Sequence, residues 1–360
     1  MHTPKINYDY LQPFKELPLI LRILCLRRTR GQQSNNALIV NPSLIGDFAS
    51  SLHSMRAYIE TGKSNVDLVV SPQLKSLAKK VRGVRNVYSA KTLHSRDAEG
   101  NATSHSIPEK YDSVLVLRAS KGAHQLLKTA RFRHIKTSLR LYVPYFLNLV
   151  TCCFTKRKMK PYWEVGFDLI SERPRKLPFE EIFDFSEVDY ETVRRMPALR
   201  TDDKIVIIHT GSGWKMKLWD NKKWAELIQQ LNRSGKFRFV FVGHEEEEEA
   251  YTEISNRLDF KTYSMIGNDV VELLLAMRIA SYFIGVDSGP RNMAHVADLR
   301  SVTIVGPDHA MFPVFDKRDV LIAKSKSCDT LQLLFHSNTP HIDKIDVQEV
   351  YEAFLRLQES

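Results

Sequence analysis

Three short segments of the chain combine glycine with hydroxyl, carboxylate and lysine side chains at points where predicted strands end. Glycine lets the backbone approach an anion closely, hydroxyl and backbone N–H groups donate hydrogen bonds to it, and lysine supplies positive charge. A carboxylate beside such a site can accept a proton or hydrogen bonds from a sugar hydroxyl. These residue types therefore favour chemistry on a phosphorylated substrate. The segments are residues 41–48, 209–219 and 287–295.

The segment 209–219, HTGSGWKMKLW, leaves a predicted strand and leads into a predicted helix that begins near Asp220. Its glycines, hydroxyls and two lysines outline a cradle for a diphosphate. It contains neither G-x-x-x-x-G-K-[ST] nor G-x-G-x-x-G, which disfavours ATP hydrolysis and the use of NAD. An ordinary glycine-rich loop with exposed lysines explains this segment alone equally well.

The segment 287–295, DSGPRNMAH, also leaves a predicted strand, and Pro290 suits the first turn of the helix that follows. Free N–H groups there and the Ser288 hydroxyl can hold a phosphate, while Asp287 can accept hydrogen bonds from sugar hydroxyls. A helix N-terminus without a ligand is the alternative. We expect His295 to be a packed or surface residue of this helix rather than a catalyst.

The segment 41–48, NPSLIGDF, follows the first predicted strand. Its aspartate, Asp47, can act as a general base toward a hydroxyl nucleophile. The alternative is a helix N-cap, a position that aspartate often fills. Taken alone, the triplet I-G-D at 45–47 does not choose between the two.

Short apolar runs alternate with helical patterns along the chain, and this alternation predicts the elements that position the three segments. One such helix carries Trp224, Leu227 and Leu231 on one face. Strands alternating with helices of about 10 to 15 residues indicate parallel β-α-β units. We therefore expect an α/β fold with two Rossmann-like domains and a ligand cleft at the carboxyl ends of their strands. The predicted strands are 37–40, 66–70, 84–89, 111–117, 204–209, 237–243, 262–267, 282–287 and 301–307.

This alternation is regular in the second half of the chain and looser in the first half, with little periodicity in between. We place the connection between the domains at about residues 155–203. The N-terminal domain then covers residues 1–180 and the C-terminal domain residues 204–340, followed by a terminal helix at 341–360. Residues 91–110 are polar and predict a surface loop.

The chain has 360 residues and a net charge of +10, from 52 Lys and Arg against 42 Asp and Glu. Its 43% hydrophobic and 26% charged residues exclude a disordered tail, a collagen and a coiled coil. The positive charge suits nucleic acid, an anionic membrane surface or an anionic substrate. The cysteines form no C-x-x-C pair, and neither a secretory signal nor a membrane-spanning stretch is evident. We expect a cytoplasmic protein, either soluble or peripheral to a membrane.

In order and spacing, the three segments resemble glycosyltransferase family 9, the ADP-heptose:lipopolysaccharide heptosyltransferases, which are inverting enzymes of GT-B fold. The resemblance extends from about Ala37 to Pro307. It implies two Rossmann-like domains that face each other across a cleft, the N-terminal one binding the acceptor and the C-terminal one the nucleotide sugar. Its most specific parts are I-G-D (45–47), K-L-W (217–219), D-S-G-P (287–290) and V-G-P (305–307).

The resemblance also implies roles for individual residues. Asp47 matches the base that deprotonates the acceptor hydroxyl, and Lys217 matches the lysine that pairs with the donor diphosphate and stabilises the departing nucleotide. Asp287 matches an aspartate that contacts the donor sugar. A family glutamate near the nucleotide ribose falls within 245–249, where favourable charge at a helix N-terminus is an equally strong explanation. The expected donor-binding residues are Thr210, Gly211, Ser212, Lys215, Glu245, Glu247, Asp287, Ser288, Gly289 and Pro290.

Asn292 departs from the family pattern D-T-G-P-x-H, because it stands where histidine is common. This difference bears on the choice of donor, and His295, one helical turn on, is a hypothetical substitute. The family neutralises the diphosphate with lysine and helix N-termini, and the sequence shows no cluster with metal-ligand spacing. We therefore expect an ADP-sugar donor, no metal and no other cofactor.

Acceptors of the family are anionic glycolipids of the inner leaflet, and basic residues of this chain suit such a partner. Four of them follow a predicted strand end in the N-terminal half and can pair with acceptor phosphates. They are Arg118, Lys121, Arg131 and Arg133. The acceptor-binding residues that we expect are Ser43, Gly46, Arg118 and Lys121.

Two longer stretches, 17–30 and 141–160, set apolar residues beside a basic cluster, a composition typical of an interfacial anchor. A core helix with a solvated basic end explains each stretch equally well. The partners that we expect are a nucleotide-sugar donor, an anionic glycolipid or glycan acceptor and the cytoplasmic face of the inner membrane, with no nucleic acid.

Three other interpretations stay open. The first keeps the GT-B fold but changes the chemistry: the protein would be an enzyme with another donor or a protein acceptor, or a nucleotide-sugar epimerase. A nucleic-acid-binding protein also explains the positive charge, but no recognised binding motif is present. A degenerate, non-catalytic member of the family that binds a glycan is compatible with Asn292.

Overall fold

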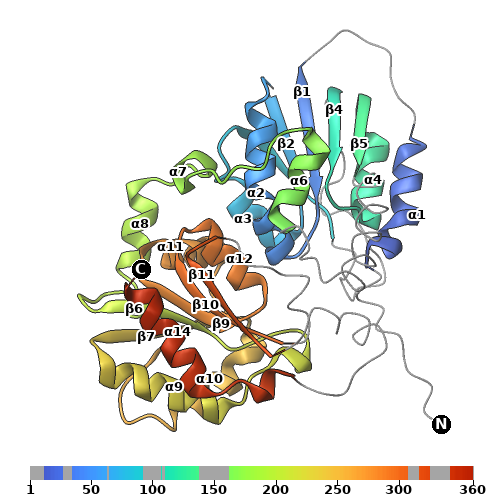
Figure 1. Ribbon diagram of the computed structural model, residues 1–360. Coiled ribbons are helices and arrows are strands. Elements are labelled where there is room, and N and C mark those ends of the chain that lie inside the picture. Colours follow the sequence, from blue (N-terminus) through green and yellow to red (C-terminus); the bar gives the residue numbers. More distant parts are fainter. Residues whose placement is uncertain are drawn as a thin grey trace, which may run out of the picture. The chain divides into compact units, whose positions relative to one another are not determined.

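A computed structural model gives the fold of the chain (Figure 1). The described residues up to Asp184 form one compact unit, here called the N-terminal unit, and those from Phe185 onward form a second, the C-terminal unit. Most of the predicted loop at 91–110 and all of the stretch at 141–160 lie outside the described residues. The structure describes residues 12–26, 35–62, 65–91, 107, 110–137, 162–306, 316–324 and 341–359.

The N-terminal unit is built on a parallel sheet with the strand order β3-β2-β1-β4-β5. From β1 the chain adds β2 and β3 on one side, and it then adds β4 and β5 on the other side. The direction in which strands are added therefore reverses between the adjacent strands β1 and β4. The predicted strands in this unit are confirmed within one or two residues. The strands are β1 (Asn36–Asn41), β2 (Asn65–Val70), β3 (Val84–Ser89), β4 (Lys110–Val116) and β5 (Arg131–Thr137).

Helices cover both faces of this sheet (Figure 1). On one face, α1 (Gln12–Leu24) and α4 (Lys121–Thr129) pack over the apolar residues of β1 and β4. On the other lies α2 (Ile45–Glu60), with α6 (Tyr162–Ile170) and α7 (Phe179–Ile182) packed against it. A turn at Pro72–Leu74 and the short helix α3 (Lys75–Ala78) connect β2 to β3.

The described part of the 17–30 stretch lies mainly in α1, one face of which is buried in the core. Leu19, Ile20 and Ile23 are buried there, while Leu21 on the outer face is 48% exposed. The described part is therefore a helix of the core, one of the two interpretations that the sequence allows. Among the described residues, no helix is long and apolar enough to cross a bilayer.

The C-terminal unit is built on a second parallel sheet, with the strand order β11-β10-β9-β6-β7-β8. Numbered within the unit, this is the same doubly wound order as in the first sheet, and it reverses between β6 and β9. The strands are β6 (Lys204–His209), β7 (Phe237–Gly243), β8 (Tyr263–Ile266), β9 (Tyr282–Val286), β10 (Arg300–Val305) and β11 (Asp319–Ala323).

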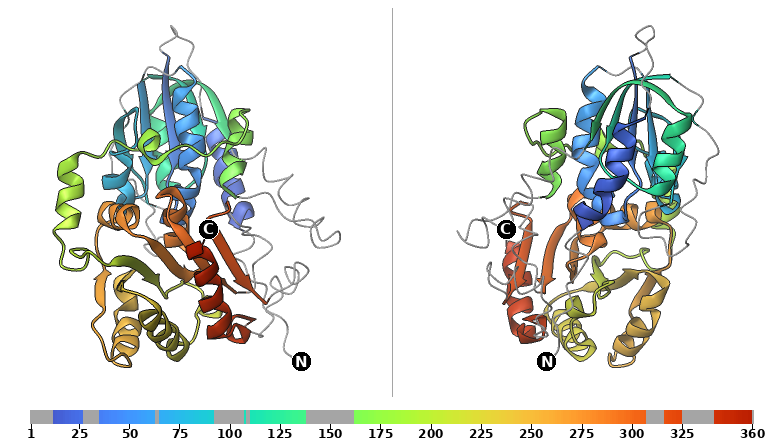
Figure 2. Two further views of the ribbon diagram at one scale, coloured as in Figure 1. Left: turned by 60° about the vertical axis from the view of Figure 1, so that its left-hand side comes forward. Right: turned by 90° about the vertical axis from the view of Figure 1, so that its right-hand side faces the viewer.

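One face of the second sheet is covered by α9 (Asn221–Ser234), α10 (Glu248–Ser255) and α14 (Val347–Glu359). The views in Figure 2 show α14, drawn in red, alongside α9 and the last strands. The other face is covered by α11 (Val270–Ile279) and α12 (Gly289–Val296). The terminal helix thus packs within the C-terminal unit.

The remaining described elements of this unit are short. Helix α8 (Glu187–Arg194) packs against α11, and single turns lie at Lys215–Lys217, Glu245–Glu247 and His341–Lys344.

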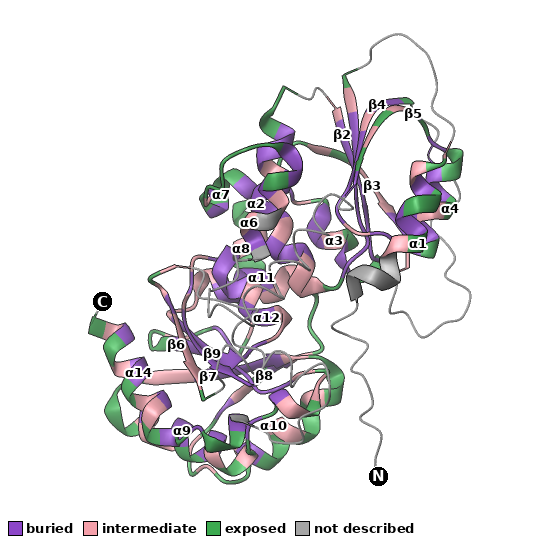
Figure 3. Ribbon diagram, turned by 45° about the vertical axis from the view of Figure 1, so that its right-hand side comes forward, coloured by how far each residue is buried: buried purple, intermediate pink, exposed green. Residues whose placement is uncertain are grey.

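The central strands, such as β1, β6 and β9, are buried almost throughout, while many helices expose one side (Figure 3). Strands with helices on both faces need apolar residues at nearly every position, which is why runs such as KIVIIH were readable from the sequence. The predicted α/β fold with two Rossmann-like parallel sheets is confirmed.

The position of Arg131 and Arg133 corrects one expectation. The sequence placed both after a strand end, but they lie at the beginning of β5, where Arg131 pairs with Lys110 of β4. Helix α4 returns the chain to the amino edge of the sheet before β5 starts, as a parallel connection requires. Arg133 instead contacts Asp112 at 3.4 Å.

Candidate active site

The candidate residues gather at equivalent places in the two sheets. In a doubly wound sheet, ligands bind beyond the carboxyl ends of the two strands at which the strand order reverses. In the N-terminal unit these strands are β1 and β4, which are followed by Asp47 and Arg118. In the C-terminal unit they are β6 and β9, which are followed by the segments 210–217 and 287–290.

Asp47 lies in the first turn of α2 and is not its N-cap, since that position belongs to Leu44. Its carboxylate Oδ2 accepts a hydrogen bond from Arg118 Nη2 at 2.7 Å. The arginine is itself held at the end of β4, because its backbone N–H donates to the Val40 carbonyl at 3.3 Å. The Asp47 side chain is 43% exposed. This carboxylate is therefore oriented by an arginine and open to a ligand.

The other expected acceptor residues lie around this pair. Ser43 is buried, and its hydroxyl has no hydrogen-bond partner among the described residues. Its carbonyl accepts from the Ser71 hydroxyl at 2.9 Å, which ties the loop after β1 to the end of β2. Gly46 is in the first turn of α2, and Lys121 is the exposed first residue of α4.

On the donor side, the structure brings Lys217 and Asp287 together. Lys217 Nζ lies 2.9 Å from Asp287 Oδ2, and the two side chains are only 10% and 6% exposed. The ammonium also lies 4.9 Å from the centre of the Trp214 ring. A lysine and an aspartate that are 70 positions apart in sequence thus form a buried ion pair at the β6 and β9 strand ends.

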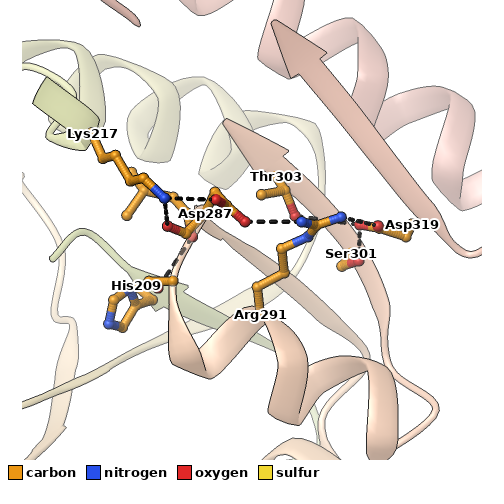
Figure 4. A network of polar contacts seen from close by, with 9 residues as sticks. His209, Lys217, Asp287, Arg291, Ser301, Thr303 and Asp319 are labelled. Carbon is orange, nitrogen blue, oxygen red and sulfur yellow. Dashed lines mark hydrogen bonds and ion pairs between the residues drawn. The ribbon is translucent and has the colours of Figure 1, made fainter. Parts of the chain in front are cut away.

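Asp287 has a second cationic partner, which the sequence did not single out (Figure 4). Its other oxygen, Oδ1, lies 2.9 Å from Arg291 Nη1, and Arg291 Nη2 lies 2.7 Å from Asp319 Oδ2. Asp319 is the first residue of β11 and accepts hydrogen bonds from the Ser301 and Thr303 hydroxyls at 2.8 and 3.3 Å. The result is a buried row of alternating charges from Lys217 to Asp319.

The pKa values of this row follow from its charges. Burial raises the pKa of the Asp287 carboxyl, but Lys217 and Arg291 lower it by more, so its pKa lies below the ordinary value. Burial lowers the pKa of the Arg291 guanidinium, whereas Asp319 and Asp287 raise it above the ordinary value. Asp287 is therefore a stable carboxylate.

His209, the last residue of β6, connects the donor-side segments. Its Nδ1 lies 3.2 Å from the Ser288 hydroxyl and its Nε2 lies 3.5 Å from Glu247 Oε2. Ser288 is the N-cap of α12, yet within the described residues its side chain makes no cap hydrogen bond. The Ser288 hydroxyl therefore points to His209 instead of capping the first N–H groups of α12.

Packing separates the two favoured glutamates. A methyl group added at Gly211 or Gly243 would collide with the Glu247 carboxyl, whereas one added at Gly267 would meet Glu245. Glu247 therefore lies over the ends of β6 and β7, next to the segment 209–219, and Glu245 lies over the end of β8. Burial raises the pKa of the Glu247 carboxyl, partly offset by its hydrogen bond from the His244 N–H.

The rest of the loop after β6 presents both buried and exposed groups. Thr210 and Gly211 are buried, whereas Lys215 is exposed. The half-buried Ser212 accepts a hydrogen bond from the Trp214 N–H at 3.2 Å. Gly289 and Pro290 form the first turn of α12, as the sequence predicted. Among the described residues, no cluster of His, Cys, Asp and Glu is suited to a metal ion.

A pH dependence of stability follows from His209. Burial lowers its pKa to about 4, below the model-peptide value of 6.5. The unfolded chain then binds more protons than the folded one between these values, so acidification destabilises the fold by up to about 3 kcal/mol. The raised pKa of Glu247 acts in the opposite direction above the ordinary glutamate pKa of 4.5, because there the folded chain binds more protons than the unfolded one. We expect His209→Asn to reduce the loss of denaturant-measured stability between pH 7 and pH 4.5; an unchanged pH profile would contradict this.

Comparison with known proteins identifies the family. The sequence model of glycosyltransferase family 9 (heptosyltransferase) matches residues 106–330, more than half of the chain. The chain belongs to glycosyltransferase family 9. The predicted family is thereby confirmed, and the chain is a glycosyltransferase by family; the match includes the segments 209–219 and 287–295 and begins after the segment 41–48. No curated protein is significantly similar to it in sequence.

Solved structures of several glycosyltransferases share the fold. A family 9 glycosyl transferase from Veillonella parvula is 14% identical with a TM-score of 0.70, covering 92% of this chain and 100% of that one. The Escherichia coli heptosyltransferase WaaC with ADP-2-deoxy-2-fluoro heptose is 16% identical with a TM-score of 0.60, covering 89% and 99%. The iron-containing glycosyltransferase TibC from E. coli is 16% identical with a TM-score of 0.57, covering 92% and 78%. At these identities the similarity establishes the GT-B fold.

Proposed function

We propose that the protein is an inverting glycosyltransferase that moves a heptose from ADP-heptose to a hydroxyl group of a lipopolysaccharide-core-type or other glycan acceptor. The observation that carries the proposal is the buried Lys217–Asp287 pair at the strand-order reversal of the C-terminal sheet. The family assignment supports the reaction class, and the E. coli relative with an ADP-heptose analogue supports the donor.

The C-terminal unit supplies the groups that would bind the donor. Lys217 would neutralise the diphosphate and the charge that develops on the departing nucleotide. The first N–H groups of α12, left uncapped by the Ser288 side chain, would donate to a phosphate. Asp287, held as a carboxylate, would accept hydrogen bonds from sugar hydroxyls.

The N-terminal unit supplies the base. Asp47 would accept the proton of the acceptor hydroxyl as its oxygen attacks the anomeric carbon from the side opposite the leaving nucleotide, which inverts the configuration. Arg118 would fix the orientation of this carboxylate through their 2.7 Å contact. With Lys121 it also adds positive charge near the acceptor, which favours an anionic glycan. We propose that the acceptor is met at the cytoplasmic face of the inner membrane.

Two assays test the donor and the reaction. We expect calorimetric titration to show tighter binding of ADP-heptose than of UDP- or GDP-sugars. Radiolabel should then pass from ADP-heptose to a lipopolysaccharide-core acceptor. An isomerised donor without transfer would instead indicate an epimerase, and donor binding without any turnover would indicate a non-catalytic member of the family.

A glycine in the donor loop offers a focused test of the Glu247 position. In Gly211→Ala the new methyl group would displace the Glu247 carboxyl, so we expect weaker binding of ADP-heptose and little change in the unfolding midpoint. Gly213→Ala is the matched control, because nothing described lies within 4 Å of the added methyl group. Equal affinities of the two variants, measured by calorimetry, would exclude a donor contact at Glu247.

We also propose that the transfer needs no metal, since Lys217 and the α12 N-terminus supply the positive charge that a diphosphate leaving group needs. The expected outcome is a transfer rate that is unchanged after dialysis against EDTA. A rate that falls with EDTA and returns with an added metal would contradict this proposal and bring the protein closer to the iron-containing relative TibC.

A further inference from the structure

Arg291 and Asp319 are deeply buried, yet the proposed reaction gives neither a role. The Arg291 side chain is 2% exposed and that of Asp319 is 3% exposed. The guanidinium uses one terminal nitrogen for Asp287 and the other for Asp319, at 2.9 and 2.7 Å. Arg291 therefore bridges two carboxylates, one of them the expected donor-sugar contact (Figure 4).

Asp319 gives this bridge a fixed anchor in the sheet. Ser301 and Thr303 lie two positions apart on β10, so their side chains point to the same face. Both hydroxyls donate to Asp319 Oδ1, at 2.8 and 3.3 Å, and leave Oδ2 for the arginine. Because β10 and β11 pair directly, the sheet holds Asp319 beside Ser301 and Thr303. Asp319 in turn holds the Arg291 guanidinium.

Lys217 and Arg291 approach different oxygens of Asp287. Lys217 lies at Oδ2 and Arg291 at Oδ1, each at 2.9 Å. If Lys217 were the sole cation there, its movement toward a phosphate would leave a buried carboxylate uncompensated, which costs much free energy. With Arg291 in place, Asp287 keeps a hydrogen-bonded cation at its other oxygen when Lys217 moves.

We propose that Arg291, anchored by Asp319, is a positioning residue that holds the Asp287 carboxylate in place and so leaves Lys217 available to a diphosphate ligand. The inference rests on the proposed function in taking that diphosphate to belong to the donor. Arg291 itself touches no substrate group in this proposal. Without it, Lys217 stays with Asp287 and contributes less to diphosphate binding.

A double-mutant cycle tests this, with inorganic pyrophosphate and ADP-heptose as calorimetric probes. The four proteins are the native chain, Lys217→Met, Arg291→Met/Asp319→Asn and the triple variant. Arg291 and Asp319 are replaced together because either change alone would leave a buried charge unpaired. The Lys217→Met factor is the ratio of the pyrophosphate dissociation constants with and without this substitution. We expect the factor to be about ten or more in the native background. In the background without Arg291 and Asp319 it should be smaller by about threefold or more.

The outcomes separate a positioning role from a structural one. An equal Lys217→Met factor in both backgrounds would overturn the proposal, as would pyrophosphate binding that does not depend on Lys217. Arg278→Met is the matched control: Arg278 Nη1 contacts Asp298 Oδ2 at 3.7 Å in the same unit, and its loss should leave the Lys217→Met factor unchanged.

Two further results complete the test. If thermal unfolding shows that Arg291→Met/Asp319→Asn does not fold, or that the triple variant, in which Asp287 has neither cation, does not fold, Arg291→Lys replaces the double change in the cycle. A single ammonium group retains the charge but not the two-pronged bridge, so the Lys217→Met factor should again shrink; an unchanged factor would overturn the proposal. If pyrophosphate shows the coupling but ADP-heptose transfers no sugar, the proposed donor is wrong and the role of Arg291 stands.

Discussion

Replacement of Asp47 by asparagine is expected to lower the transfer rate by about 10²- to 10⁴-fold, the usual contribution of a general base. Asparagine has nearly the same shape and keeps an oxygen that Arg118 Nη2 can contact, but it cannot take up a proton. The groups proposed to bind the donor lie in the other compact unit, so affinity for ADP-heptose should be unchanged. Steady-state rates and calorimetric affinities measure the two quantities separately.

A surface ion pair in the same unit supplies the control for Asp47→Asn. Asp184 pairs with Arg82 at 3.1 Å, and its side chain is 74% exposed, so Asp184→Asn removes one carboxylate without touching the candidate site. It should transfer at the native rate. If Asp47→Asn also retained that rate, Asp47 would not be the base, and the Asp47–Arg118 pair would be structural.

The fold could be predicted because most of its strands are covered on both faces. β6 and β9 are buried almost throughout, so their sequences are continuous apolar runs. β5 escaped prediction because it lies at the edge of its sheet and alternates buried residues with exposed charged ones. β11, also an edge strand, was missed as well: four of its five residues are only partly buried.

The candidate site divides along similar lines. Asp47, Lys217 and Asp287 lie in segments that the composition of the sequence marks, and the strand order shows that each segment follows a strand at which the order reverses. The contact between Arg291 and Asp319 could not be predicted, because it joins residues 28 positions apart through the register of a missed strand. Five consecutive glutamates gave no basis for choosing one, whereas packing puts Glu247 beside Gly211.

Lys217→Met should cause the second large loss, of about 10²- to 10³-fold in the transfer rate, together with weaker donor binding. Methionine fills a similar volume but cannot stabilise the charge that develops on the departing diphosphate, and a preorganised group of this kind typically contributes that much. Asp287 keeps Arg291 as a partner, so the variant should fold. Rates, donor affinity and the thermal unfolding midpoint are the measurements.

The control for this change is Lys324→Met, which removes an exposed lysine paired with Glu349 in the same unit and should leave transfer unaffected. Lys217→Arg restores the charge with a different geometry and should recover part of the rate. If Lys217→Met transferred at the native rate, the leaving group would have to be neutralised by another cation. Sensitivity of that variant to EDTA would then show whether a metal ion takes this role, since dialysis removes a bound metal but leaves every lysine of the protein in place.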